Sequence, residues 1–388
     1  MSRTFAIVCV LLAACGSKEA GPPSSEKTGK EAATPVQPAE TPAPAPITNQ
    51  EVDTFGAAMA QALAGCDPSA VDRLIDTERF RERTLAAAGP DAPPALRRAI
   101  SPLGQSICAG LGTEFSVRYV GAVEVGGSVR PRIRTIVSTG VNFLEPVLER
   151  RADGSVIAVD LFSFRNGEMM SELLTMTAKF MRHPQGEAAG RAFVTATQRN
   201  SAGDHAGARA SFQSIPAELR TKIKAIALQG LTIDKNLDAK IYLASIAEFR
   251  KNFPDDPVVT MIEIDAHALR RDHEALVASL DALAARTGDD AYVRVLRAEA
   301  YRDGGDLGAA KRDAEAALAA EPALVPALEI RLEIAMDEKK WDDAVQSLRG
   351  MVAAGIPKAG LQEAAASEAR YRALVQSAAY KAWAAEPS

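Results

Sequence analysis

Two patterns of apolar and polar positions follow one another along the chain. Between residues 115 and 165, apolar side chains alternate with polar ones and many are β-branched, which is typical of strands buried on one side. Before and after this stretch, apolar residues recur every three or four positions, which indicates amphipathic helices. The pattern therefore predicts a mixed fold: an α+β region, with helices packed on one antiparallel sheet, followed by an all-α region.

The α+β region is expected to span residues 51–183. Asp67-Pro68-Ser69 predicts a helix N-cap, whereas Gly126-Gly127 and Asp153-Gly154 predict hairpin turns. Helices are expected at 51–64, after Asp67, after Pro93-Pro94 and at 168–181, and strands at 115–120, 129–138, 141–151 and 156–165.

Four charged residues on the expected strands are interpreted as solvated side chains: Arg130, Arg132, Arg134 and Asp160. Charged residues are rarely buried unless they are paired, so arginines along one strand face are expected to point into water. Contact of these arginines with lipid headgroups is the functional alternative.

The order of helices and strands is similar to the nuclear transport factor 2-like superfamily, whose cone-shaped domains carry helices over a curved sheet. The best match is the hairpin VNFLEPVLERRADGSVIAVDLFSFRNGEMMSELL. The resemblance implies a pocket inside the cone, which in enzymes of the superfamily holds an acid–base pair such as Asp and His. Residues 113–165 contain no His. We therefore expect no catalytic residues, and a ligand-binding or enzymatic role of the pocket is the alternative.

The all-α region, residues 187–358, contains a segment that resembles the tetratricopeptide repeat, DAYVRVLRAEAYRDGGDLGAAKRDAEAALAAEP. The matching positions are Ala298, Tyr301, Gly305, Ala310, Ala317 and Pro322. When the sequence is shifted in steps of 34 residues, small and apolar residues recur at the same positions, which predicts five units that stack into a solenoid. The units are expected at 189–222, 223–256, 257–290, 291–324 and 325–358. Arg294 and Arg297 stand where such repeats usually carry apolar residues. Residues 359–388 are expected to form capping helices.

The repeat resemblance implies a concave groove lined by the first helix of each unit, in which a peptide or helix binds. The groove positions are Met261, Asp265, Tyr292, Val295, Glu299, Arg302, Glu329, Glu333 and Met336. The glutamates would select a basic ligand, with Tyr and Met as apolar contacts. A solvated surface without a ligand is the alternative.

The N-terminus is interpreted as a targeting signal. Arg3 precedes an apolar run that is too short to span a bilayer, as in a signal peptide over residues 1–14. The following Leu12-Ala13-Ala14-Cys15 resembles the bacterial lipobox, which implies a lipid on Cys15 and an anchor in the cell envelope. No Asp follows Cys15, which implies the outer membrane in Gram-negative bacteria. Residues 15–50, rich in Pro and Ala, are expected to form a disordered tether. An ordinary secretory signal, or a chance apolar start, is the alternative.

Two cysteines remain after the lipobox, Cys66 and Cys108. An oxidising envelope favours a disulfide between them, and two buried free thiols are the alternative. The chain has no Cys-x-x-Cys, and its four His lack a metal-ligand spacing, so we expect neither a metal site nor a cofactor. The formal net charge of −5 argues against nucleic-acid binding.

These features predict a lipid-anchored envelope scaffold or adaptor, not an enzyme, that binds partner proteins through the repeat groove. A pilotin-like assembly factor for secretion, pili or outer-membrane biogenesis is a further alternative. The sequence does not name the partner.

Overall fold

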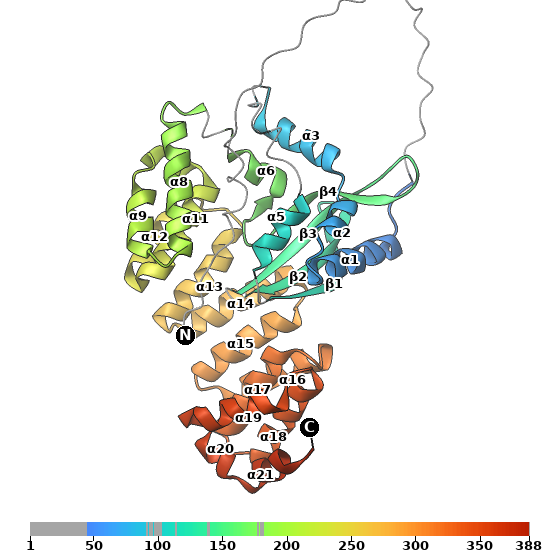
Figure 1. Cartoon of the computed structure of the whole chain (residues 1–388), viewed down its shortest axis with the longest axis vertical. Coiled ribbons are helices and arrows are strands. Elements are labelled where there is room, and N and C mark those ends of the chain that lie inside the picture. The colour runs from blue at the N-terminus through green and yellow to red at the C-terminus, as the bar shows by residue number, and fades with distance from the viewer. Residues whose placement is uncertain are drawn as a thin grey trace, which may run out of the picture. The chain divides into compact units, whose positions relative to one another are not determined.

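The structure, a computed structural model, describes residues 45–387 except 91, 93–95, 97–102, 113–114, 138–139, 177 and 179–181. The predicted signal peptide, Cys15, most of the tether and the helix start at Pro93-Pro94 lie outside the described residues. The chain divides into two compact units, Met1–Ser245 and Ile246–Ser388, and the division falls within helix α12 (Ala239–Asn252). A sheet with helices comes first and a mostly helical region follows, so the expected order of the two folds is confirmed (Figure 1).

Five strands form one antiparallel sheet in chain order: β1 (Phe115–Val125), β2 (Ser128–Val137), β3 (Gly140–Arg150), β4 (Val156–Ser163) and β5 (Glu168–Met169). Each strand pairs with the next one, so every connection is local. Gly126 and Gly127 both have positive φ and join β1 to β2, which confirms the predicted two-residue turn.

Two expected elements have different bounds. The first strand continues to Val125 because its second half pairs with Ser128–Arg132 beyond a register shift at Gly121. The expected helix at 168–181 begins as strand β5, where Met169 pairs with Phe162, and only then turns into α6 (Met170–Leu174). In both places pairing with a neighbouring strand overrides the local pattern.

Helices pack on one face of this sheet and form the core of the α+β part. They are α1 (Asn49–Ala64), α2 (Pro68–Arg73), α3 (Thr77–Ala88) and α5 (Leu103–Leu111). The predicted cap of α2 is confirmed, because the Asp67 side chain accepts a hydrogen bond from the amide of Ala70. The core joins side chains from helices and strands, including Phe55, Met59, Leu63, Phe80, Ile133, Leu144 and Leu161.

Some charged side chains of the strands are buried. The expectation that these side chains are solvated was therefore wrong for three of the four positions. Arg132 and Arg134 are 5% and 2% exposed, and Arg132 donates two hydrogen bonds to the buried carboxylate of Glu145. Asp160 is also buried, and it accepts hydrogen bonds from the amide and hydroxyl of Ser171 at the start of α6. Pairing makes this burial tolerable.

Helices α8 (Gly186–Ser201), α9 (His205–Gln213), α10 (Ala217–Lys222) and α11 (Lys224–Leu237) complete the first unit before α12. Phe193 of α8 and Ile226 of α11 share a buried cluster with Met176, which follows α6. Lys224 Nζ donates to the carbonyl of Gly167 at 3.0 Å. Helical and α+β parts are therefore packed together within this unit.

The second unit consists of helices that follow one another with short connections. They are α13 (Val258–Arg270), α14 (His273–Thr287), α15 (Ala291–Asp303), α16 (Leu307–Ala320), α17 (Val325–Asp337), α18 (Trp341–Ala353), α19 (Lys358–Ser367), η1 (Ala369–Tyr371), α20 (Arg372–Gln376) and α21 (Ala378–Ala385). Each of α14 to α17 packs on the next, and α15 also packs on α17. Trp383 and Tyr380 of α21 join a core with Leu348 and Met351 of α18.

Candidate functional site

The predicted groove residues lie on three helices of the second unit. Met261 and Asp265 are half-buried on α13, and Tyr292 is half-buried in the first turn of α15. Further along the chain, α15 carries Glu299 and Arg302, and α17 carries Glu329, Glu333 and Met336. The structure brings these two groups together, because α15 packs directly on α17.

Val295 is not part of an accessible surface, so its prediction as a groove contact was wrong. Its side chain is completely buried. Helix α15 packs on α14, α16 and α17, which leaves little of its circumference for a ligand. Met336 is also partly used within the protein, since it packs against the core of the last helices.

Carboxylates dominate the face that α15 and α17 form, which we call the acidic face. Its acidic members are Glu299, Asp303, Glu329, Glu333 and Asp337. Arg302 crosses between the helices, with Nη1 2.8 Å from Glu333 Oε2 and Nε 2.7 Å from Asp337 Oδ2. One guanidinium thus offsets part of a concentrated negative charge.

The C-terminal segment extends the acidic face. Arg370 of η1 donates to the second oxygen of Glu333, at 2.7 Å, and to Glu368 Oε2, at 2.8 Å. Its guanidinium also stacks on the ring of Tyr371, 4.6 Å from the centroid. Both oxygens of Glu333 are therefore bound by arginines, which makes this carboxylate a structural part of the face.

Glu299 is the carboxylate of the acidic face whose pKa is raised. Desolvation and, to a smaller extent, the neighbouring carboxylates of Glu333, Asp303 and Glu329 together raise its pKa to about 7, against an opposing effect of Arg302. The side chain is nevertheless exposed to solvent. A cationic group placed there would neutralise the repulsion among these carboxylates.

Arg294 and Arg297, unusual for a repeat, have partners inside the unit. Arg297 donates two hydrogen bonds to Asp313 and one to Asp281, at 2.6–2.7 Å. Arg294 pairs with Asp289. These ion pairs connect α14, α15 and α16 and do not belong to the acidic face.

Asp160 of β4 is held by hydrogen bonds on both of its carboxylate oxygens. Its Oδ1 accepts from the amides of Leu161 and Ser171, at 2.8 and 3.2 Å, and its Oδ2 from the Ser171 hydroxyl at 2.6 Å. A carboxylate with this many donors is held as a structural acceptor, and it orients the start of α6.

Cys66 and Cys108 meet, although the structure holds them as free thiols. Cys66 lies just after α1, with a positive φ of 44°, and Cys108 is buried in α5. Burial and, to a smaller extent, a hydrogen bond with the Cys66 thiol raise the pKa of the Cys108 thiol to about 12. The predicted disulfide therefore has its two sulfur atoms side by side.

A polar cleft between α16, α17 and α18 was not predicted. Its residues come from three helices whose packing no local sequence signal specifies. Among the described residues, no group of His, Cys, Asp and Glu suits a metal ion, and no helix is long and apolar enough to cross a membrane. Comparisons with protein-family models, curated proteins and solved structures found no match to this chain.

Proposed function

We propose that this protein is a lipid-anchored scaffold of the bacterial cell envelope that holds a basic segment of a partner protein on the acidic face. The observation that carries the proposal is Glu299, a solvent-exposed carboxylate whose pKa is raised to about 7 by desolvation and, after that, by its acidic neighbours. Asp303, beside it, is exposed and forms no hydrogen bond or ion pair with the described residues. A cationic ligand relieves this repulsion, and no catalytic role is assigned.

We infer that the helical region is built of tetratricopeptide-like units. The expected ranges 223–256, 257–290, 291–324 and 325–358 each hold two consecutive helices. The small residues Ala298, Ala310 and Ala317, which the repeat needs where its helices touch, are all completely buried. Packing of α15 on both α16 and α17 is the arrangement that such units use.

The envelope location rests on the lipobox-like sequence that ends at Cys15. A lipid on this cysteine, followed by a proline-rich tether, would hold the folded units near a membrane. The test is membrane fractionation and palmitate labelling of the wild type and of Cys15→Ala. Loss of labelling and release from the membrane support the anchor, and unchanged labelling refutes it.

Binding to a defined cation tests the acidic face. We expect fluorescent oligolysine to bind the full chain, with affinity that falls as salt screens the attraction. Between pH 6 and pH 8, affinity should rise by about two- to fivefold as Glu299 becomes ionised. Glu299→Gln should remove this pH dependence.

Glu363→Gln is the matched control, because Glu363 is an exposed glutamate on α19 of the same unit. It should leave both affinity and pH dependence unchanged. Equal effects of the two substitutions would show that net charge alone attracts the peptide, and absence of binding at low salt would refute the acidic face as a docking surface. Photocrosslinking from position 303 in intact cells would then capture the natural partner.

A further inference from the structure

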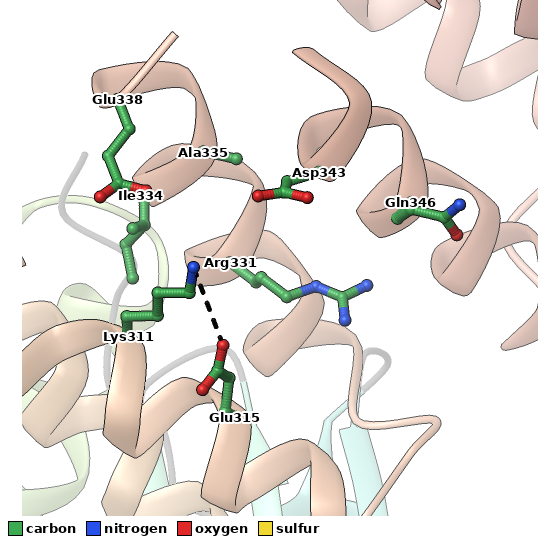
Figure 2. Close-up of a pocket in the computed structure, with 8 residues that line it drawn as sticks. All are labelled: Lys311, Glu315, Arg331, Ile334, Ala335, Glu338, Asp343 and Gln346. Carbon is green, nitrogen blue, oxygen red and sulfur yellow. Dashed lines mark ion pairs between the residues drawn. The ribbon is translucent and has the colours of Figure 1, made fainter. Parts of the chain in front are cut away.

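The cleft between α16, α17 and α18 has a volume of about 320 Å³ (Figure 2). Its lining comes from Lys311 and Glu315 of α16, Arg331, Ile334 and Ala335 of α17 with Glu338 after it, and Asp343 and Gln346 of α18. Arg331 lies two residues from both Glu329 and Glu333, which turns it to another side of α17 than the acidic face. The cleft is therefore a separate site.

Three of its charged residues already have partners. Lys311 Nζ lies 3.9 Å from Glu315 Oε1 across one turn of α16, as the dashed line in Figure 2 marks. Glu338 is paired with Lys340, outside the cleft, at 2.9 Å. The charges left over in the cleft are one guanidinium, of Arg331, and one carboxylate, of Asp343.

Arg331 is held in position by a buried hydroxyl. Its Nε donates to Ser347 Oγ at 3.0 Å, and Ser347, fully buried, donates in turn to the carbonyl of Asp343 at 3.2 Å. Neither Nη group donates to any of the described residues, and Figure 2 shows the guanidinium projecting into the space between α17 and α18. Burial lowers the pKa of Arg331, and the charges of Asp343 and Glu315 only partly oppose this. The guanidinium is thus a desolvated donor pair without an anion.

Asp343 supplies the opposite charge from the other wall. It lies in the first turn of α18, where the helix dipole favours a carboxylate, and it is exposed. Among the described residues it has no side-chain hydrogen bond or ion pair, and in Figure 2 it lies apart from the Arg331 guanidinium. Ser347 holds Arg331 through Nε, and the guanidinium forms no ion pair with Asp343.

We propose that this cleft binds a small zwitterion of amino-acid size, with its carboxylate on Arg331 and its amino group on Asp343. The guanidinium fork matches a carboxylate with two parallel hydrogen bonds, and Asp343 is an acceptor for an ammonium group. Ile334 and Ala335, which are 2% and 3% exposed, add a small apolar part to the lining between the two charges. The volume suits a small molecule. This activity goes beyond the scaffold proposed above and uses none of the acidic-face residues.

The test uses the full chain and titrates glycine, β-alanine and 4-aminobutanoate by calorimetry or ligand-observed NMR. These compounds place the two charges at increasing separations. Succinate and putrescine, which carry only one kind of charge, are the comparison ligands. We expect one of the three zwitterions to bind and both comparison ligands to bind at least tenfold more weakly, because each leaves one charge of the cleft opposed by a like charge or unpaired.

Arg331→Gln should weaken binding of that zwitterion by about tenfold or more, and Arg331→Lys, which keeps the charge without the fork, by less. Ser347→Ala should weaken it through loss of the positioning contact. Glu363→Gln, at an exposed glutamate of α19 that does not line the cleft, is the control and should have no effect. Circular dichroism establishes that each variant is folded. No binding of any zwitterion at millimolar concentration, tightest binding of succinate or putrescine, or equal affinity of wild type and folded Arg331→Gln would overturn the proposal.

Discussion

Glu299 is a residue whose charge changes near neutral pH. Its folded-state pKa of about 7 lies above its ordinary value of 4.5, so the folded protein binds this proton more tightly than the unfolded chain. The stabilisation of the folded state by this proton is complete below pH 4.5, and it is lost as the pH rises toward 7 and above. Because the side chain is exposed, solvent screening limits the change to about 1 kcal/mol.

We predict that Glu299→Gln removes this loss. The free energy of unfolding of the wild type should fall by about 1 kcal/mol relative to the variant between pH 5 and pH 8. Urea unfolding at several pH values measures it, with Glu363→Gln as the control for a lost charge. Parallel stability profiles for wild type and Glu299→Gln would contradict the prediction.

Cys66 and Cys108 give a second prediction at this scale. Under oxidising conditions they should form a disulfide, which mass spectrometry detects as a linked peptide, and which should stabilise the protein by about 3–4 kcal/mol over its reduced form. In the reduced, folded protein Cys108 should react slowly with iodoacetamide, because burial keeps its thiol protonated. Recovery of both peptides unlinked from oxidised protein would refute the bond.

Close contact between α2 and α5 depends on a glycine. A Cβ at Gly104 would lie 2.2 Å from the carbonyl oxygen of Pro68, an atom of the backbone that cannot rotate away. The amide of Gly104 also donates to Asp72 Oδ1 at 2.7 Å. The two helices can therefore approach only where α5 has no side chain.

We predict that Gly104→Ala destabilises the protein by about 1–3 kcal/mol, because the helices must move apart. Gly190→Ala is the matched control: Gly190 lies in α8, and a Cβ there meets no atom within 4 Å. That substitution should stabilise the helix by about 0.5–1 kcal/mol. Thermal or urea unfolding measures both, and two changes of the same sign would be inconsistent with the contact.

The periodicity of apolar residues predicted the sheet and the helices because it reports burial on one side of an element. It did not predict residues buried through a distant partner. Arg132 meets Glu145 thirteen positions away, and Asp160 meets Ser171 eleven positions away, so each resembles a solvated residue in the sequence. The prediction of Val295 as a groove contact was wrong for a related reason, because three helices pack on α15.

The two candidate sites differ in the same way. The glutamates of the acidic face lie on helices that recur with the 34-residue spacing of the sequence. That spacing could therefore be used to predict that these glutamates lie close together. The cleft depends on how α16, α17 and α18 pack, and on the hydrogen bond from Arg331 to Ser347. No spacing in the sequence encodes that contact.

At the scale of the whole molecule, the last helix completes the hydrophobic core of the second unit. Trp383 is 2% exposed and packs with Tyr380 and with residues of α18. The ammonium of Lys358 lies 5.2 Å from the centre of its indole ring. Without α21, the apolar side of α18 would face water.

We predict that Trp383→Ala destabilises the second unit by about 3–5 kcal/mol, through loss of packing and the cavity that it leaves. Trp341→Ala is the comparison, because the other tryptophan is only half-buried against the same core. Its effect should be smaller. Unfolding followed by circular dichroism measures both, and a larger loss for Trp341→Ala would contradict this role of α21.

Arg150 has a mechanical consequence. Its guanidinium donates to the carbonyls of Ala45 and Pro46, at 3.0 and 3.1 Å, and to both oxygens of Glu51, at 2.7 and 2.8 Å. Arg150 ends β3, the middle strand of the sheet. A pull on the chain upstream of Ala45 is therefore shared by several hydrogen bonds and passed into the centre of the sheet. Under tension, these hydrogen bonds would carry the load before α1 begins to unwind.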